Sequence, residues 1–341
     1  MRSYVLLILP SANRVYAEAA VELTVAELEV FNLTVLSGRL RDIAAATIAG
    51  VRYVGFTTDE ELTPDEVAAL SNAAGLYALF AVEGSLLRPV ATTPLAHFDD
   101  DLISIPKYAG KTNEQFTHLL LNVTLLSSTA SSSFLDGGLR VLDPLCGRGT
   151  TLNQAMVYGY DVAGIELDGK DVEAYTAFLK TYLQRKRVKH RIETVPVRRD
   201  KRLVARRVTA RITPPRGARE LTLDVVHADT TAAGEFFKPA TFDAIVTDAP
   251  YGVQHGSRTV AAGLRRSPLQ LLAEAAPGWV RLLRPGGALG LAWNTHVAAR
   301  DEAAALLRDA GLRVLDHGPY GRFQHRVDQA ITRDILVGVR A

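Results

Sequence analysis

The chain has 341 residues, of which 48% are hydrophobic and 22% are charged, and this globular composition excludes a disordered or collagen-like protein. A single cysteine excludes a disulfide framework and an all-cysteine metal cage, and scattered histidines give us no reason to expect a metal site. No apolar run approaches the ~20 residues that span a bilayer, and no secretion leader stands at the start. The sequence therefore predicts a cytoplasmic protein with no membrane partner.

The net charge is only +2, but the charges are strongly segregated along the chain. Residues 185–219 contain 14 lysines and arginines against two acids, whereas residues 1–100 contain six arginines and 13 acids. Such a dense basic segment predicts a surface that faces a polyanion. The alternative is a solvated, flexible basic loop without a partner.

Residues 1–100 alternate short strand-like runs with helical stretches, which indicates a small acidic α+β domain without recognisable chemistry. An acidic helix is expected over residues 22–31. Thr63, followed by a proline and then by Glu66, predicts a helix that begins with a capping box. The polar residues 89–101 are expected to connect this domain to the next. The expected strands are residues 4–9, 51–56 and 76–82.

From residue 139 onward, strand-like runs alternate with helical stretches, which is typical of a doubly wound, mostly parallel sheet. The last two runs are expected to form a strand pair that adds one antiparallel strand at the C-terminus. We therefore predict an α/β fold with a Rossmann-like sheet over residues 101–341, interrupted by the basic insertion at 185–219. The expected strands are residues 139–142, 161–167, 221–226, 242–247, 288–293, 312–320 and 330–340. The expected helices are residues 150–158, 170–183, 267–283 and 301–310, and residues 284–287 are expected to form a turn.

A glycine-rich turn follows the first strand of this region and precedes a helix. Gly147 and Gly149 permit positive φ and let a ligand approach the backbone, while the helix-start amides can face an anionic group. The turn lacks the Lys-Ser/Thr pair of a phosphate-binding P-loop and the third glycine of the dinucleotide fingerprint. It predicts a nucleotide-type ligand, with a generic turn as the alternative. Its residues are Asp143, Pro144, Leu145, Cys146, Gly147, Arg148, Gly149 and Thr150.

Acidic residues stand at the ends of the next strands. Glu166 comes 17 residues after Gly149, close to the ~20 expected for an acid that grips a ribose hydroxyl pair. The alternative is a strand-end acid that caps the following helix, a role that suits Asp168 better. Asp229 follows another strand and could accept a hydrogen bond from an adenine amine.

The fourth strand of the alternating region ends in Asp248, which is followed by Ala249, Pro250 and Tyr251. A carboxylate and a nearby backbone carbonyl can accept the hydrogens of the exocyclic amine of an extruded base. A proline keeps the backbone rigid, and a tyrosine ring can stack on the base. In isolation, the same tetrapeptide could be a strand-end turn with a packed tyrosine.

The motifs at residues 143–150 and 247–252, in this order, resemble those of the S-adenosylmethionine-dependent class I amino-methyltransferases. Within that class they are most similar to the tRNA guanine-N2 methyltransferases that often carry a THUMP domain. Residues 105–114 resemble the segment that such enzymes place before the glycine loop, near the methionine end of the cofactor. The resemblance covers residues 101–341 apart from the basic insertion.

The resemblance implies S-adenosylmethionine as the cofactor and methyl transfer to an exocyclic base amine, with guanine N2 of tRNA as the first expectation. It implies that Glu166 holds the ribose, that Asp229 holds the adenine amine, and that Asp248 borders both cofactor and target. The implied cofactor loop consists of Asp143, Pro144, Cys146, Gly147, Gly149 and Thr150. The implied target-amine site consists of Asp248, Ala249, Pro250 and Tyr251.

Three departures from the family pattern stand out. Ala249 occupies a position where proline is commoner, and Arg148 occupies one where a small residue is common. Residues 1–100 are too few and too acidic for a full THUMP module, so they are a reduced relative of that module or an unrelated domain. The binding of tRNA is therefore expected to depend on residues 185–219.

Other readings of the sequence stay open. The same target motif also serves adenine-N6 or cytosine-N4 methylation of DNA or rRNA, and methylation of a protein glutamine. A protein that binds nucleic acid without catalysis is a further alternative. The sequence also leaves open whether a small activating subunit takes part.

Overall fold

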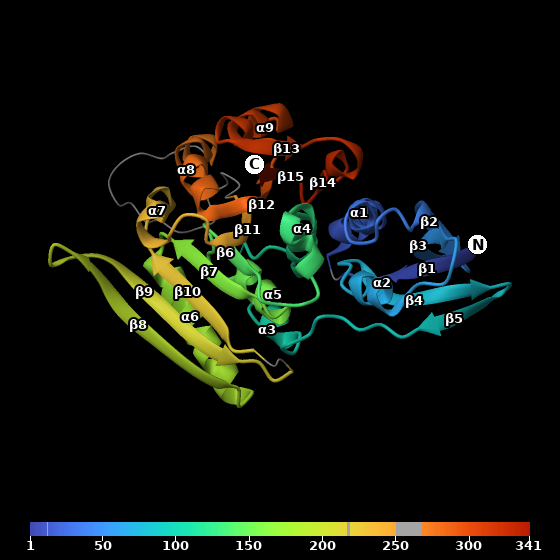
Figure 1. Ribbon diagram of the computed structural model, residues 1–341, viewed down its shortest axis with the longest axis horizontal. Coiled ribbons are helices and arrows are strands. Elements are labelled where there is room, and N and C mark those ends of the chain that lie inside the picture. The colour runs from blue at the N-terminus through green and yellow to red at the C-terminus, as the bar shows by residue number, and fades with distance from the viewer. Residues whose placement is uncertain (12, 109, 217–218, 250–267) are drawn as a thin grey trace.

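The computed structural model describes residues 1–341 apart from 12, 109, 217–218 and 250–267, and contains two β-sheets (Figure 1). The first sheet has five antiparallel strands and the second has ten strands. Among the described residues, no helix combines the length and the hydrophobicity needed to cross a bilayer.

The N-terminal sheet has the strand order β2-β3-β1-β4-β5 and packs against helix α1 (Arg14–Leu33). The capping box is confirmed in helix α2 (Pro64–Leu70), since Thr63 Oγ1 accepts a hydrogen bond from the Glu66 amide at 3.2 Å and Glu66 Oε2 accepts one from the Thr63 amide at 2.8 Å. Strand β5 includes Pro89, which the sequence analysis placed in a connection; at a sheet edge its missing N–H costs no ladder bond. The strands are β1 (Arg2–Ile8), β2 (Arg41–Ile48), β3 (Val51–Thr58), β4 (Leu76–Glu83) and β5 (Leu86–Val90).

The second sheet confirms the predicted doubly wound fold with an antiparallel C-terminal strand. Its order is β13-β15-β12-β11-β6-β7-β10-β9-β8, with β14 paired to β15. Strands β12, β11, β6, β7 and β10 are parallel neighbours, and β15 runs antiparallel between β12 and β13. The strands are β6 (Arg140–Asp143), β7 (Asp161–Glu166), β8 (Lys189–Arg199), β9 (Arg202–Thr213), β10 (Leu221–His227), β11 (Phe242–Asp248), β12 (Leu283–Asn294), β13 (Leu312–Leu315), β14 (His325–Arg326) and β15 (Thr332–Arg340).

The basic insertion is a β-hairpin and not a flexible loop, which corrects the alternative reading of that segment. Strand β9 pairs antiparallel with β10, and β8 pairs antiparallel with β9 at the edge of the sheet. Asp200 and Lys201 form the tip with φ of +47° and +63°, the left-handed pair that a two-residue hairpin turn requires. Neither residue is a glycine, so the sequence lacks the usual signal for this turn.

Helices cover both faces of the second sheet. One face packs against α4 (Glu114–Ser127), α5 (Thr150–Val157) and α6 (Gly169–Arg185), and the other against α8 (Pro268–Leu282) and α9 (Arg300–Asp309). The buried strands alternate between the two cores, because successive side chains point to opposite faces. Two short helices complete the set, α3 (Asp101–Ser104) and α7 (Ala233–Phe236).

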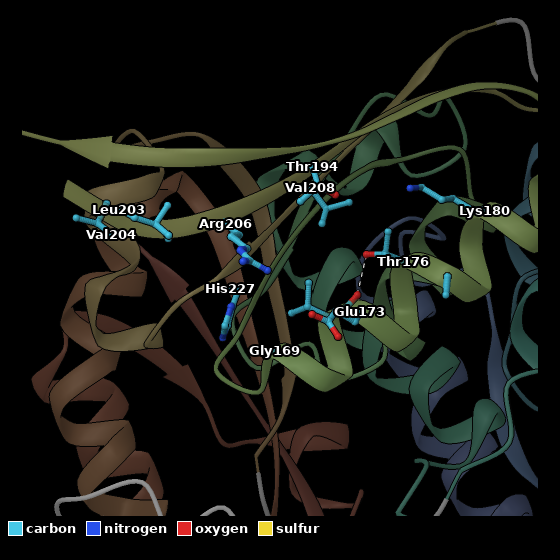
Figure 2. Close-up of a pocket in the computed structure, with 13 residues that line it drawn as sticks. Gly169, Glu173, Thr176, Lys180, Thr194, Leu203, Val204, Arg206, Val208 and His227 are labelled. Carbon is cyan, nitrogen blue, oxygen red and sulfur yellow. Dashed lines mark hydrogen bonds between the residues drawn. The ribbon is translucent and has the colours of Figure 1, made fainter. Parts of the chain in front are cut away.

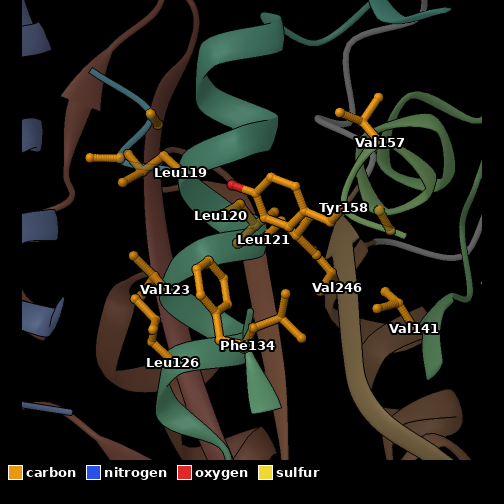
Figure 3. Close-up of a cluster of buried hydrophobic side chains, with 14 of the residues drawn as sticks. Leu119, Leu120, Leu121, Val123, Leu126, Phe134, Val141, Val157, Tyr158 and Val246 are labelled. Carbon is orange, nitrogen blue, oxygen red and sulfur yellow. The ribbon is translucent and has the colours of Figure 1, made fainter. Parts of the chain in front are cut away.

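Helix α4 is absent from the expected elements, although it lies at the centre of one core. Figure 3 shows Leu120 and Leu121 of this helix in one cluster with Tyr158 and Val246. Its apolar side chains point in nearly all directions, since the helix is enclosed by α1, α5 and the sheet. A helix buried all round carries no clear amphipathic period in its sequence.

Two further expectations are corrected. Residues 284–287 are not a turn before the strand but a bulge inside β12. Phe242 of β11 pairs with Leu283 of β12, and Ala244 of β11 pairs with Ala288, so β12 has extra residues between these two pairs. The strand expected over residues 312–320 ends at Leu315, because the following segment coils into a short 3-10 helix.

A buried polar cluster joins α1 to α4. The Glu27 carboxylate accepts hydrogen bonds from the Ala74 amide at 2.9 Å and from Asn122 Nδ2 at 2.7 Å. Tyr158 donates its hydroxyl to Asn122 Oδ1 at 2.7 Å. Burial raises the pKa of Glu27 to about 7.

Candidate functional site

The second sheet reverses its direction of winding at β6, which has β7 on one side and β11 on the other. In open α/β sheets, ligands bind outside the carboxyl ends of the strands at such a switch point. Asp143 ends β6, Glu166 ends β7, Asp229 follows β10 and Asp248 ends β11. The fold therefore brings these four acids, which are far apart in the sequence, to one edge of the sheet.

The two glycines of the loop after β6 have different surroundings. Gly147 has φ of +48°, and a Cβ placed on it would have no atom within 4 Å. Gly149 has φ of +78°, and a Cβ there would lie 2.4 Å from the Tyr175 ring. Gly149 is thus required for packing beneath the loop, whereas Gly147 leaves its backbone facing open space where a ligand can approach.

Glu166 ties the ends of β6 and β7 together. Its Oε2 accepts a hydrogen bond from the Gly147 amide at 2.8 Å, and its Oε1 accepts one from the Asp168 amide at 2.8 Å. Burial raises the pKa of Glu166, and the backbone hydrogen bonds oppose that rise. Each carboxylate oxygen has further acceptor capacity for a ligand hydroxyl. Asp168 serves as the N-cap of α6, where its Oδ1 accepts from the Lys170 amide at 2.8 Å.

Leu167, between these two acids, is a residue that the sequence analysis missed. Its side chain is 68% exposed, although it directly follows a buried strand. An exposed leucine beside Glu166 offers an apolar surface to a flat ligand. A leucine in this position has no distinctive sequence signal, because strand-end leucines are usually buried.

The remaining loop residues form the wall behind the site. Asp143 and Pro144 are buried, and Asp143 Oδ1 accepts from the Leu145 amide at 3.1 Å. Burial raises the pKa of Asp143 to about 7, and the charge of Asp248 adds to that rise. Burial likewise raises the pKa of the Cys146 thiol, so this cysteine is unsuited to act as a nucleophile.

The segment before α4 contacts the loop through Tyr108. Its hydroxyl lies 2.8 Å from Thr150 Oγ1, and the Arg148 guanidinium lies 5.0 Å from the centre of its ring. Arg148 Nε also bonds to Asp171 Oδ1 at 2.8 Å. Arg148 is therefore held against the protein by a cation–π contact and an ion pair.

Asp248 has neighbours from two distant parts of the chain. Thr112 Oγ1 donates a hydrogen bond to its Oδ2 at 2.6 Å, and Arg333 Nη2 lies 3.5 Å from the same oxygen. Ala249 is buried, and its amide donates to the Ala292 carbonyl at 2.8 Å, which keeps the backbone in the sheet up to this point. Pro250 and Tyr251, the other predicted members of the target site, lie outside the described residues.

Asp229 lies on the same edge beyond β10. Its Oδ1 accepts from the Thr231 amide at 2.9 Å and from the Thr231 hydroxyl at 2.7 Å. The carboxylate thus has a fixed orientation at the start of a short 3-10 helix. Among the described residues, no group of three or more His, Cys, Asp or Glu is arranged to hold a metal ion.

A cavity of about 800 Å³ lies between α6 and the β8–β9 hairpin (Figure 2). It borders the strand-end site only at Gly169 and His227, and none of the four strand-end acids lines it. Its walls are mainly apolar, so the chemistry belongs to the strand ends and not to this cavity. The lining residues are Gly169, Val172, Glu173, Thr176, Ala177, Lys180, Thr194, Leu203, Val204, Ala205, Arg206, Val208 and His227.

The doubly wound sheet thus carries at its carboxyl edge a glycine loop with open backbone beside a strand-end acid, and its last strand is antiparallel. Residues 115–287 match the family described as "RMKL-like, methyltransferase domain". Because this match spans just over half of the chain, the chain belongs to that family. S-adenosylmethionine is its cofactor, and the open backbone at Gly147 beside the Glu166 carboxylate fits such a ligand.

Solved structures with a similar fold include other methyltransferases. A TehB-like SAM-dependent methyltransferase from Corynebacterium glutamicum is 13% identical, with a TM-score of 0.34 over 60% of this chain and 82% of that one. Precorrin-6y C5,15-methyltransferase from Geobacter metallireducens is 14% identical, with a TM-score of 0.40 over 73% of this chain and 99% of that one. A methyltransferase from Pyrococcus furiosus is 15% identical, with a TM-score of 0.39 over 69% and 88%. No curated protein sequence matches the chain.

Proposed function

We propose that this methyltransferase modifies an exocyclic base amine, with guanine N2 of tRNA as the target. The observation that carries the proposal is Asp248, a carboxylate held at the end of β11 on the same edge as the glycine loop and Glu166. In the sequence it is followed by Ala249, Pro250 and Tyr251, and a backbone carbonyl, a rigid proline and a stacking ring suit the amine of a flipped base.

The cofactor half of the site would be formed by the loop and by the ends of β7 and β10. The Gly147 backbone would face the cofactor, and the Glu166 carboxylate would accept hydrogen bonds from two ribose hydroxyls. Asp229 would accept from the adenine amine, and Leu167 would cover the adenine ring. When bound, S-adenosylmethionine supplies a methyl group activated by its sulfonium charge.

The target half would be organised around Asp248. Its carboxylate and the Ala249 carbonyl would accept the two hydrogens of the amine, which aims the nitrogen lone pair away from them. Tyr251 would stack on the base, and Pro250 would restrict the backbone. Asp248 would take the proton that the nitrogen loses as the new N–C bond forms and the bond between the methyl carbon and the sulfonium sulfur breaks, its electron pair remaining on the sulfur. No covalent enzyme intermediate is needed, so orientation and charge placement supply most of the rate enhancement.

The basic segment would bind the RNA, but only part of its charge is available. Seven of its 14 cations form ion pairs with acids of the described chain: Lys186, Arg191, Arg199, Arg207, Arg211, Arg216 and Arg219. The other seven have no acidic partner among the described residues: Arg185, Arg187, Lys189, Arg198, Lys201, Arg202 and Arg206. Three of these lie at the hairpin tip, which we propose contacts the phosphate backbone.

The test uses purified protein, isotope-labelled S-adenosylmethionine and separate pools of unmodified tRNA, rRNA and DNA, with the products identified as nucleosides by mass. Labelled N2-methylguanosine from tRNA is the expected result. Labelled methyladenine or methylcytosine from DNA or rRNA would keep the amine chemistry and overturn the target. Asp248→Ala should abolish transfer and keep cofactor affinity, whereas substantial turnover by this variant would refute the role of Asp248.

A further inference from the structure

We infer that Thr112 and Arg333 act together as positioning residues that set the orientation of the Asp248 carboxylate. The inference rests on the proposed function of Asp248 in aligning the target amine. Both residues lie outside the strand-end motifs, and both contact the same oxygen, Asp248 Oδ2.

Thr112 is held in place by anchors on both sides. Lys111 Nζ, on one side, donates to the Ile103 carbonyl at 2.6 Å and pairs with Glu114 Oε1 at 2.5 Å. Asn113, on the other side, is the N-cap of α4, and its Oδ1 accepts from the Phe116 amide at 3.1 Å. A hydroxyl fixed in this way can hold its acceptor in one orientation.

Arg333 reaches Asp248 from the start of β15. Its side chain is 4% exposed, and its guanidinium lies 4.4 Å from the centre of the Phe116 ring. Phe116 lies in the first turn of α4, four residues after Thr112, so the start of this helix lies close to both neighbours of Asp248 in the sequence or in space. His325, paired with Arg333 across the β14–β15 register, is kept neutral because burial lowers its pKa to about 4.

The contact that Thr112 makes differs from those of other threonines nearby. Thr117 and Thr124, both buried in α4, donate to carbonyls of their own helix at 3.2 Å and 2.7 Å. Thr112 instead donates to a side chain 136 residues further along the chain. The Thr112 hydroxyl thus bonds across the fold and not within its own segment, and this contact indicates a role toward Asp248.

The Thr112 hydroxyl and the Arg333 guanidinium both hold Asp248 Oδ2, so the carboxylate plane cannot rotate freely. The direction in which Oδ1 points is thereby set. The alignment of a nucleophile relative to its electrophile is sensitive to such placement, and a shift of about 1 Å can cost roughly a hundredfold in rate. Loss of the Thr112 hydroxyl should therefore reduce kcat by about tenfold, and loss of the Arg333 cation by about a hundredfold.

The experiment compares Thr112→Val, Thr112→Ser, Arg333→Met and Arg333→Lys with the wild-type protein. Thr117→Val, in the α4 helix that begins two residues after Thr112, is the control. The measurements are kcat and KM for the nucleic-acid substrate, the cofactor affinity by calorimetry and the melting temperature. Thr112→Val should lower kcat with KM and cofactor affinity unchanged, Thr112→Ser should restore it, and Thr117→Val should keep wild-type kcat.

A double-mutant cycle separates this inference from the proposed function. Single-turnover assays at high enzyme concentration measure the residual transfer of Asp248→Asn, and adding Thr112→Val to this variant should cause no further loss. If Asp248→Asn abolishes transfer but Thr112→Val turns over within twofold of wild type, the inference is wrong and the proposed function stands. If Asp248→Asn is fully active, the proposed function is wrong, and the inference, which depends on it, is wrong as well. If no nucleic acid is methylated, crystal structures decide, and a carboxylate that keeps its orientation in Thr112→Val overturns the inference.

Discussion

The glycine loop supports a sharp test of where the cofactor approaches the backbone. Gly147 has φ of +48° and nothing within 4 Å of an added Cβ. Gly84, in the turn between β4 and β5, has φ of +61° and the same open surroundings. Alanine at either position meets the same left-handed backbone and no steric contact in the protein, so Gly84→Ala is a matched control for Gly147→Ala.

The expected magnitudes follow from that match. A non-glycine residue in the left-handed region costs roughly 1–2 kcal/mol, so both variants should lose a similar and modest amount of stability. Only the methyl group at residue 147 projects from the loop that is tied to Glu166, where the Gly147 amide donates to Oε2 at 2.8 Å. We expect Gly147→Ala to weaken S-adenosylmethionine binding at least about tenfold, which is about 1.4 kcal/mol, and Gly84→Ala to leave it unchanged.

Isothermal calorimetry gives the two affinities, and denaturant unfolding gives the two stabilities. Equal cofactor affinities in Gly147→Ala and Gly84→Ala would refute the assignment of the cofactor to this face of the loop. A third variant, Gly149→Ala, should behave differently from both, because its Cβ would lie 2.4 Å from the Tyr175 ring. It should lose far more stability than the other two.

Three further predictions concern other parts of the molecule. Burial raises the pKa of Glu27 from 4.5 to about 7, so between these values the folded state keeps a proton that the unfolded state has lost. The free energy of unfolding, measured with urea, should therefore fall by about 3 kcal/mol as the pH rises through this window. In Glu27→Gln this contribution to the fall should be absent. The same pH dependence in the variant and the wild-type protein would show that Glu27 does not hold this proton. Charge reversal of the hairpin tip (Arg198, Lys201 and Arg202 to Glu) should weaken RNA binding and flatten its salt dependence while cofactor affinity is kept; unchanged RNA affinity would exclude the tip. Cys146, buried with a raised pKa, should react with iodoacetamide only after unfolding, and rapid labelling of the native protein would show that the loop opens.

Elements with local signals could be predicted from the sequence. The capping box of α2 depends on Thr63 and Glu66, three residues apart, and the structure confirms it. The alternation of strands and helices after residue 139 likewise predicted the doubly wound sheet, since each strand and its helix are encoded within about 30 residues. The same local reasoning located the glycine loop and the strand-end acids, because parallel strands bring their carboxyl ends to one edge.

Elements that depend on distant partners could not be predicted in this way. The β8–β9 hairpin contains many charged side chains, and its strands are stable because β9 pairs with β10 and extends the sheet. Helix α4 is enclosed by other elements, so its apolar residues follow no single face.

The sequence by itself determined the fold class, the glycine loop and the presence of Asp248 at a strand end, because local patterns of neighbouring residues predict each of them. Only the tertiary structure decided what surrounds Asp248. Thr112 and Arg333 lie on opposite sides of it in the sequence, 136 and 85 residues away. The resemblance placed residues 105–114 near the cofactor, but no local pattern relates Thr112 or Arg333 to Asp248. They meet at one carboxylate oxygen because α4 and β15 both pack against the strands of the central sheet, an arrangement set by long-range burial of apolar surface.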